Sequence, residues 1–442
     1  MSLYSRFLEQ TLWPLHNAVR GRHYAKHRKA LEKSQWWTAS QLREFQWLEL
    51  TRLLDIAFGS VPYYQEKYGS LGIRRQDIQS WEDFAKLPPL RRGEVAANRD
   101  RLRNPAFAGK LRPHATGGSS GVPTRFFITT ESYDWRSACT QRVYSWTGCR
   151  LGDRAVYLWG APVGKPPRWK SAKVKLYQRL QGQLMFNTFE QTDALWERVV
   201  EGIARHRAEF VVGYVSSLEG FSRYLARTGR KIRPVKAVIA AAEPVFPETR
   251  RTIESAFGAP LFNTYGSREF MSIAGECERH NGLHVNAENL VVEVESPGEP
   301  SAVLVTDLHN FGMPFLRYEI GDVAVVDNGS CECGRGLPRL RSIEGRLLDM
   351  LRTSDGRIVP GELFPHVMKD IPEVLEFQVQ QQTLDHIVLS VVLSSPISDR
   401  SRGLLEGEIR KAFGDGTRVE VKAVEAIQRL ASGKRRVTIG LS

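Results

Sequence analysis

The sequence FVVGYVSSLEGFSRYLARTGRKIRPVKAVIAAAEP, residues 210–244, contains one complete strand–helix–strand unit. Its apolar runs Phe210–Tyr214 and Ala237–Ala241 have the length and composition of buried strands. Between them, Leu218–Thr228 has the apolar spacing of an amphipathic helix. Strand–helix alternation of this kind predicts parallel strands in an α/β fold.

The same alternation continues on both sides of this unit. Further strands are predicted from the apolar runs Ala155–Trp159, Val291–Glu295 and Ala302–Thr306. Further helices are predicted at Asp193–Arg205 and Glu248–Phe257. We therefore expect a large N-terminal domain of parallel and mixed sheets with helices. The closer spacing of strands near 290–326 predicts a small β subdomain within it.

The two ends of the chain differ from this middle part. Apolar residues recur at helical spacing through residues 1–60, which predicts helices, and SVPYYQEKY (60–68) is interpreted as a turn that closes them. Near the other end, the pattern predicts a small α+β domain, with strands and a helix at Phe377–Val379, His386–Leu393, Ser401–Ala412 and Arg418–Ala423. We expect residues 1–348 to form the large domain and residues 349–442 a small mobile C-terminal domain.

Composition limits the class of protein. No run approaches the ~18–20 apolar residues of a membrane span, and the N-terminus has no signal-peptide pattern. Five cysteines, a low and odd number, favour a reducing cytoplasm over a disulfide framework. The net charge of +13 favours an anionic partner, although solvated surface explains it equally. The basic stretch Arg20–Lys33 fits a solvated helix face or peripheral contact with a membrane or acidic partner.

A glycine-rich string, ATGGSSGVPTRF (115–126), is the first candidate ligand site. Backbone N–H groups and hydroxyls in such a string can converge on an anion, because glycine has no Cβ to block approach. The string lacks the P-loop lysine pattern, and a plain surface turn is the alternative.

Three further strings offer complementary groups. In NTYGSRE (263–269), Tyr265 offers a flat face for a purine, Thr264 a hydroxyl for a phosphate, and Glu269 an oxygen ligand for Mg²⁺. In RYEIGD, Asp322 suits the two hydroxyls of a ribose, and in ASGKRR, Lys434 suits a cationic catalytic group. Each has an ordinary alternative: a hydrogen-bonded loop, a turn and a solvated tail charge, respectively.

Taken together and in order, these strings resemble the adenylate-forming superfamily, which includes acyl-CoA synthetases and luciferase. The ordered strings are Thr116–Gly121, Ala241–Pro244, Asn263–Glu269, Arg317–Asp322, Gly345–Asp349 and Ser432–Arg435. VPYYQEKY, ATGGSSGVPT, YGSRE, FLRYEIGD and CECGRGLPRLRSIEGRLLDML carry a closer resemblance to the phenylacetate–coenzyme A ligase-like group, in its capsular-polysaccharide-associated branch. The resemblance covers residues 40 to 440.

The resemblance implies roles for individual residues. Thr264, Glu269 and Lys434 would be catalytic, with Glu269 holding Mg²⁺, Lys434 bridging the carboxylate and the α-phosphate, and Asp349 at the domain hinge. ATP would contact Thr116, Gly117, Gly118, Ser119, Ser120, Gly121, Ala241, Ala242, Glu243, Pro244, Asn263, Tyr265, Gly266, Ser267, Asp322 and Arg346.

A separate set of residues has zinc-binding chemistry. Thiolates and imidazoles are the preferred zinc ligands, and a structural site needs four of them. The set expected is Cys277, His284, Cys331 and Cys333, with His280 as an alternative to His284. Some members of the resembled group have a Cys/His cluster between the same motifs. The alternative is reduced cysteines beside ordinary histidines.

The resulting functional expectation is ATP-dependent activation of a carboxylic acid through an acyl-adenylate. The acyl group would pass to coenzyme A or, alternatively, to an amine or hydroxyl in cell-surface polysaccharide or secondary-metabolite synthesis. A silent nucleotide-binding protein is the third interpretation, opposed by the presence of Glu269, Asp322, Arg346 and Lys434 together. No motif supports nucleic-acid binding. The expected cofactors are ATP, Mg²⁺, coenzyme A and zinc, in a cytoplasmic monomer or homodimer.

Overall fold

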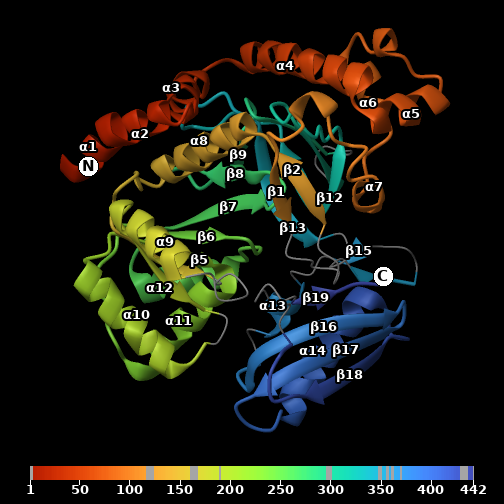
Figure 1. Cartoon of the computed structure of the whole chain (residues 1–442). Coiled ribbons are helices and arrows are strands. Elements are labelled where there is room, and N and C mark those ends of the chain that lie inside the picture. Colours follow the sequence, from red (N-terminus) through yellow and green to blue (C-terminus); the bar gives the residue numbers. More distant parts are fainter. Residues whose placement is uncertain are drawn as a thin grey trace.

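The computed structural model describes residues 3–115, 124–159, 168–188, 191–294, 301–346, 351–354, 358–359, 363–368, 371–428 and 437–441. Figure 1 shows the N-terminal helices along one side of a large sheet, and the C-terminal strands and helices as a separate body. In the part of the chain so described, no helix is both long and apolar enough to cross a membrane.

The large sheet has eleven strands in the order β10-β11-β12-β13-β9-β8-β7-β6-β5-β3-β4. Strands β3 to β7 pair in parallel, and the other pairs are antiparallel. The strands are β3 Ala155–Trp159, β4 Gln183–Asn187, β5 Phe210–Tyr214, β6 Ala237–Ala241, β7 Leu261–Ser267, β8 Met271–Glu276, β9 Leu283–Val285, β10 Leu290–Val294, β11 Ser301–Asp307, β12 Tyr318–Asp327 and β13 Arg339–Arg346.

The expected small β subdomain near 290–326 needs correction. Strands β10, β11 and β12 do not form a sheet of their own but extend the large sheet through β13, which pairs with β9. The pairing places Arg339 opposite His284, two residues far apart in the sequence. Spacing along the chain detects neighbouring hairpins but not this long-range pairing.

The parallel half of the sheet follows the sequence pattern closely. Strands β3, β5 and β6 have the bounds that their apolar runs predict, and β6 is buried along its whole length. Strands covered on both faces read as continuous apolar runs, as these do. The covering helices are α9 Arg168–Leu180, α10 Asp193–His206, α11 Val215–Thr228 and α12 Pro247–Phe257. Gly229 and Gly258 end the last two helices in the left-handed conformation that favours glycine.

Helices cover most of the described residues up to 60, as predicted: α1 Leu3–Phe7, the π-helical η1 Leu8–Leu12, α2 Trp13–Val19, α3 Tyr24–Ser34 and α4 Ala39–Ser60. Further helices, which were not predicted, follow: α5 Pro62–Ser70, η2 Arg75–Asp77, α6 Trp81–Ala85, α7 Arg92–Ala97 and η3 Pro105–Phe107. The turn expected at 60–68 is wrong, because α5 covers most of that segment. Pro62 lies in its first turn, where proline favours a helix, and Tyr64 and Tyr68 are buried on one side.

Two elements connect the helices to the sheet. Helix α8, Thr130–Trp146, is packed against α3 and β8. The hairpin of β1, Arg112–Ala115, and β2, Arg125–Ile128, pairs Ala115 with Arg125 at the end next to the connecting loop. The first glycine-rich string joins these two strands.

The C-terminal part has its own four-stranded sheet in the order β18-β17-β16-β19 and its own hydrophobic core, drawn from residue 351 onward. The predicted strands His386–Leu393 and Arg418–Ala423 are confirmed. The elements are β14 Leu351–Arg352, β15 Ile358–Val359, α13 Leu363–Met368, β16 Val374–Thr383, β17 His386–Leu393, α14 Asp399–Phe413, β18 Arg418–Ala423 and β19 Thr438–Ile439.

Candidate functional site

Two of the six predicted strings lie side by side at one edge of the large sheet. String 241–244 follows β6, and string 263–269 runs along β7 into the turn beyond it. The two strands are parallel, with Ala241 opposite Thr264. The carboxyl ends of parallel strands in an open α/β sheet are the usual place for a ligand. This edge is therefore the candidate nucleotide site.

The string after β6 is held by a contact with α11, the helix that precedes this strand. Ala242 has a left-handed φ of 71°, which turns the chain at the strand end. The Glu243 carboxylate then accepts hydrogen bonds from the backbone N–H of Ser216 at 2.6 Å and from its Oγ at 3.1 Å. Ser216 lies in the first turn of α11, where the helix dipole favours a carboxylate. No pattern in the sequence predicts this contact.

The polar groups at the start of the β7 string contact the neighbouring strands. Thr264 Oγ1 donates a hydrogen bond to the carbonyl of Ala240 at 2.8 Å. The backbone N–H of Asn263 donates to Glu276 Oε2 at 2.9 Å. The Thr264 hydroxyl hydrogen is therefore used within the sheet, and donating it to a phosphate requires the hydroxyl to rotate.

Tyr265 and Asp322, predicted to contact the base and the ribose, are directly bonded. The Tyr265 hydroxyl donates to Asp322 Oδ2 at 2.9 Å, and both side chains are buried. Their strands, β7 and β12, are separated in the sheet by β8, β9 and β13. The sheet therefore curves so that these two strands approach each other. Folding thus joins two residues that the sequence only suggested separately.

A second tyrosine–carboxylate pair lies at the same junction. Glu269, the predicted Mg²⁺ ligand, accepts a hydrogen bond from the hydroxyl of Tyr318 on β12 at 3.3 Å. Only 8% of Glu269 is exposed. The Tyr318 ring packs against Phe315 and Phe270, with centroids 4.9 and 6.0 Å away. The two pairs tie β7 and the turn after it to β12.

The turn of this hairpin depends on a glycine. A Cβ at Gly266 would overlap the carbonyl oxygen of Met271, so the close approach of β7 and β8 admits only glycine there. Met271 has a left-handed φ of 59°, and Ser267 Oγ accepts a hydrogen bond from the Phe270 N–H at 3.3 Å. These features fix the position of Glu269.

Arg317 is a buried residue that the sequence analysis quoted without assigning a role. Its Nε donates to the two carboxylate oxygens of Glu293 at 3.0 and 3.2 Å. Its Nη1 donates to the carbonyls of Ala85 and Leu87. These bonds hold the segment after α6 against the start of β12. An arginine inside the apolar run MPFLRY was the signal that could have identified it.

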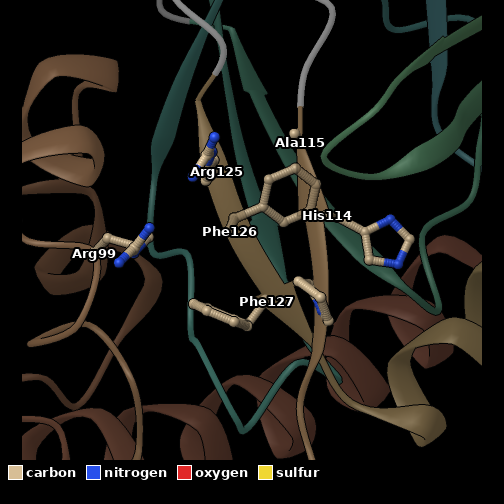
Figure 2. A pocket seen from close by; sticks show the side chains of 7 residues that line it. Arg99, His114, Ala115, Arg125, Phe126 and Phe127 are labelled. Atoms are coloured by element: carbon tan, nitrogen blue, oxygen red, sulfur yellow. The ribbon is translucent and has the colours of Figure 1, made fainter. Parts of the chain in front are cut away.

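The hairpin that carries the first glycine-rich string borders a cavity of about 360 Å³. Figure 2 shows Arg99 on one side and His114 on the other, with Phe126 and Phe127 between them. Burial, and then the positive charges of Arg136 and Arg268, lower the pKa of His114. Arg268 belongs to YGSRE, so the hairpin lies near that string.

Several predicted residues lie outside the described part of the chain. Thr116–Gly121, Asp349 and Lys434 are among them, and their placement stays a prediction. Arg346 ends β13 opposite Asp322 in the strand register, although its side chain is not described. At the ends of β3 and β5, Trp159 and Tyr214 pack with ring centroids 4.4 Å apart.

The predicted Cys/His residues converge on one point. Ligand atoms of Cys277, His284, Cys331 and Cys333 all lie within 4.8 Å of one another. The sulfurs of Cys277 and Cys331 are 3.8 Å apart, and Cys333 Sγ is 3.3 Å from His284 Nε2. A tetrahedral zinc with Zn–S bonds of about 2.3 Å separates two sulfurs by about 3.8 Å. The donor set and its spacing therefore fit zinc.

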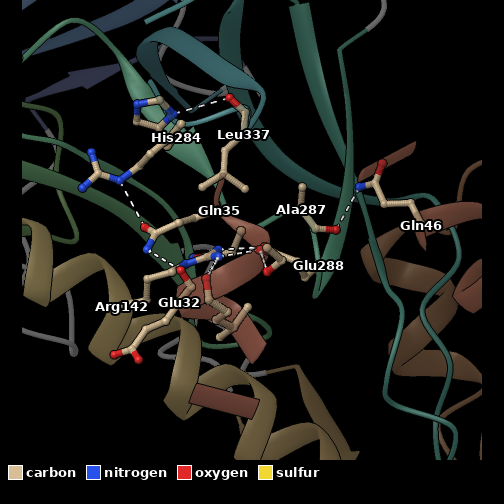
Figure 3. A network of polar contacts seen from close by, with 12 residues as sticks. Glu32, Gln35, Gln46, Arg142, His284, Ala287, Glu288 and Leu337 are labelled. Carbon is tan, nitrogen blue, oxygen red and sulfur yellow. Dashed lines mark hydrogen bonds and ion pairs between the residues drawn. The ribbon is translucent and has the colours of Figure 1, made fainter. Parts of the chain in front are cut away.

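Surrounding hydrogen bonds orient this cluster. His284 Nδ1 is 3.4 Å from the carbonyl of Leu337, so Nε2 is directed to the thiols, as in zinc sites with an outer hydrogen-bond partner. Figure 3 shows this contact and the buried network nearby. In that network Arg142 bonds Glu288 at 2.5 and 2.8 Å, and Gln46 bonds the carbonyl of Ala287 at 3.0 Å.

Proton affinities within the cluster differ. Burial raises the pKa of Cys277 to about 12 and lowers that of His284 to about 4. Burial opposes ionisation of Cys333 too, but hydrogen bonds from the backbone and side chain of Arg335 hold its pKa below the ordinary value. A neutral imidazole beside thiols that lose protons on binding is the usual chemistry of a zinc site.

His280, the alternative ligand, lies apart from the cluster. Its Nδ1 is 3.2 Å from Glu276 Oε2, and its ring packs on Phe262 with centroids 4.4 Å apart. The geometry therefore groups His284, not His280, with the three cysteines.

Comparisons with known proteins agree with this architecture. The family model "CapK C-terminal domain" matches residues 351–440. A phenylacetate–coenzyme A ligase of Thermus thermophilus is 26% identical over 383 residues, covering 80% of this chain and 82% of the relative. "Protein CapK" of Staphylococcus aureus is 24% identical over 368 residues, covering 80% of this chain and 79% of the relative.

Solved structures show the same fold. A 2-hydroxyisobutyryl-CoA ligase in the postadenylation state, in complex with 2-HIB-AMP, aligns with a TM-score of 0.71 at 19% identity, over 91% of this chain and 90% of that one. The same ligase in its thioesterification state aligns with a TM-score of 0.60 over the same shares of both chains. Residues 351–440 thus match the CapK C-terminal domain, and over most of its length the chain is similar to phenylacetate–coenzyme A ligases and to a CapK protein, with the fold of a coenzyme A ligase.

Proposed function

We propose that this chain is an AMP-forming acid–thiol ligase. It activates a carboxylic acid with ATP, releases pyrophosphate, and transfers the acyl group from the adenylate to coenzyme A. The observation that carries the proposal is the junction of β7 and β12, where Tyr265 bonds Asp322 and Tyr318 bonds Glu269. The names of two relatives, phenylacetate–coenzyme A ligases of Thermus thermophilus and Pseudomonas putida, support the acceptor.

The residues at this junction have defined tasks in the proposed reaction. Asp322 accepts hydrogen bonds from the ribose hydroxyls, and Tyr265 packs beside the base while its hydroxyl orients that carboxylate. Glu269 is the residue that would hold Mg²⁺, which would neutralise charge developing on the phosphate oxygens. Lys434 would bring a cation to the α-phosphate, and the string 116–121 would orient the other phosphates. No side-chain nucleophile is needed.

Domain movement belongs to the same proposal. We place the boundary near residue 349, which the C-terminal core and the family match from residue 351 support. The C-terminal domain would present Lys434 during adenylation and withdraw it for thioester formation. The cytoplasmic location and the monomeric or homodimeric state remain predictions from the sequence.

The test is pyrophosphate release from Mg·ATP with a panel of aryl, hydroxy, amino and short acyl carboxylates, each with and without coenzyme A. The proposal expects release that needs one class of acid and rises with coenzyme A. If ATP binds and no acid in the panel supports release, the assigned reaction is wrong.

A second acceptor is favoured by two likenesses. The C-terminal family and one relative bear the name CapK, and an amide bond synthetase from Marinactinospora thermotolerans shares the fold with a TM-score of 0.51 at 19% identity. Acyl transfer to an amine or hydroxyl is therefore the alternative. Pyrophosphate release that does not change with coenzyme A but rises with an amine or amino sugar would support this alternative.

We further propose that the Cys/His cluster holds one structural zinc. All four protein ligands are present, which leaves no open position for catalysis. Elemental analysis of protein purified without chelator should give one zinc per chain. His284→Ala should lose the metal, and His280→Ala, its matched control, should keep it. Zinc near zero in the unchanged protein would contradict this assignment.

A further inference from the structure

The positive charge of the chain is concentrated in two segments. Residues 1–33 and 168–180 together contain twelve Lys and Arg against two Glu, a net +10 of the chain's +13. The two segments make up about a tenth of the sequence. The remaining nine-tenths carry only +3, so the charge is a local property and not a general one.

Folding brings the two segments together. The Tyr4 hydroxyl donates a hydrogen bond to the carbonyl of Leu180 at 2.6 Å, and the Tyr177 hydroxyl hydrogen-bonds His16 Nε2 at 2.6 Å. The Trp13 and Tyr177 rings meet edge to face at 5.7 Å. Figure 1 shows α1, α2 and α9 on the same side of the molecule. We call the surface formed by residues 4–33 and 172–185 the N-terminal face.

The N-terminal face also carries exposed apolar side chains. Among the described residues, fifteen large apolar side chains are exposed, and nine of them lie here. Val19 is 81% exposed and Leu15 is 61% exposed. The nine are Tyr4, Phe7, Leu12, Leu15, Val19, Val174, Leu176, Leu180 and Met185. A gathering of this size, bordered by charge, marks an interaction surface.

The acidic groups of this face do not offset its charge. Glu9 lies near both Arg28 and Arg150, at 3.8 and 3.7 Å, and Glu32 pairs with Arg28 at 2.9 Å. In α9 the exposed lysines Lys173 and Lys175 alternate with Val174 and Leu176, and residues 168–180 contain no acidic residue. Charge and apolar surface are thus interleaved.

We propose that the N-terminal face binds the surface of an anionic lipid membrane, without crossing it. Helices lying in a membrane interface combine exposed apolar residues with Lys and Arg, because the former enter the acyl boundary and the latter meet the headgroups. A second copy of the chain would bring one positively charged face against another, and nucleic acid would leave Leu15 and Val19 without apolar partners. The inference goes beyond the proposed ligase activity and does not depend on it.

The test is co-sedimentation of the full chain with vesicles. One set is phosphatidylcholine alone, and the other is equal parts of phosphatidylcholine and phosphatidylglycerol. Binding to the mixed vesicles, weakened by salt, and none to the neutral ones is expected. Absence of binding to the mixed vesicles would overturn the proposal.

Two paired variants separate the charge from the apolar contribution. Lys173→Glu with Lys175→Glu should weaken binding by at least about tenfold, since each basic residue near an anionic leaflet contributes about a fivefold factor. Leu15→Gln with Val19→Gln should weaken it by about tenfold. The matched controls are Arg410→Glu with Lys411→Glu on α14, and Leu71→Gln with Leu404→Gln, all exposed positions elsewhere.

The variants also show whether the N-terminal face binds something other than a membrane. Control pairs that lose binding as much as the test pairs would overturn the proposal, as would an apolar pair that binds like the unchanged chain. The mass in solution, from light scattering, gives a further check. A dimer that Leu15→Gln with Val19→Gln converts to monomer would assign the face to a second copy. Circular dichroism confirms that each variant is folded.

Discussion

The Cys/His cluster and the candidate nucleotide site are both multi-residue sites, but their described residues are held together in different ways. In the cluster, four ligand atoms lie within 4.8 Å of one another, and all four residues are described. At the nucleotide edge, Tyr265–Asp322 and Tyr318–Glu269 are in place, while Thr116–Gly121 and Lys434 fall outside the described residues. The cluster is a compact set of ligand atoms, whereas the described part of the candidate nucleotide site consists of two tyrosine–carboxylate pairs that join separate parts of the sheet.

The largest effect should come from Lys434, which the proposed function assigns only to the nucleotide site. Lys434→Ala is expected to lower adenylation by roughly 10²–10³-fold, since one preorganised charge at the transition state is worth about that much. ATP binding by calorimetry and zinc content should match the unchanged chain. The control is Lys411→Ala, an exposed lysine on α14. Adenylation at the original rate would remove Lys434 from the mechanism.

The Cys/His cluster should show the opposite pattern, with a large effect on stability and little effect on activity. Cys331→Ser should lose zinc and lower the free energy of unfolding by roughly 3 kcal/mol, because it removes a metal that binds only the folded chain. The turnover number for pyrophosphate release, measured well below the unfolding temperature, should hardly change. Denaturant titration with and without chelator gives the stability. A zinc-free variant with unchanged stability, or one that is stable but inactive, would contradict the view that the cluster stabilises the fold and takes no part in the reaction.

Lowering the pH should lower the stability of the folded chain through His309. Its Nε2 hydrogen-bonds the carbonyl of Glu288 at 2.9 Å, its Nδ1 is 3.9 Å from Glu49, and its ring stacks on Trp135. Burial lowers the pKa of His309 to about 4. Between that value and the ordinary 6.5, the unfolded chain binds a proton that the folded chain does not, so stability falls as pH falls.

The expected loss is about 2 kcal/mol between about pH 7 and pH 5. Urea titrations at several pH values measure it, and His309→Gln should show a flatter pH dependence over this window. The prediction fails if the variant and the unchanged chain lose stability in parallel.

The smallest effect should come from Tyr265, whose hydroxyl is bonded to Asp322. Tyr265→Phe keeps the ring but removes the bond to Asp322, and a hydrogen bond to a charged group is worth about 1.5–3 kcal/mol. The KM for ATP should rise about tenfold with little change in kcat. Tyr224→Phe, which removes a tyrosine–carboxylate bond to Glu197 far from the site, is the matched control. An equal rise in the control would exclude a positioning role for Tyr265.

Local patterns predicted much of the fold. The strands Ala155–Trp159, Phe210–Tyr214 and Ala237–Ala241 have the predicted bounds because each is a short apolar run that is buried in a parallel sheet. The error at α5 arose because Pro62 suggests a turn equally well as the start of a helix. The continuity of the eleven strands depends on the pairing of Arg339 with His284, which no local pattern contains.

The candidate sites were predictable as residue types but not as contacts. The ligands Cys277, Cys331 and Cys333 follow from thiol chemistry, yet only the structure selects His284 over His280. Tyr265 and Asp322 were each assigned to the nucleotide, but their mutual bond depends on curvature of the sheet. The role of Arg317 depends on Glu293 and the carbonyls after α6, so it too required the folded chain.

The central claim is that this chain forms an acyl-adenylate at the junction of β7 and β12. The most direct measurement is exchange of labelled pyrophosphate into ATP in the presence of one active carboxylic acid and without coenzyme A. The account predicts exchange that needs the acid, does not need coenzyme A, and is strongly reduced by Asp322→Ala. Acid-dependent ATP consumption with no exchange, or exchange unaffected by Asp322→Ala, would contradict it.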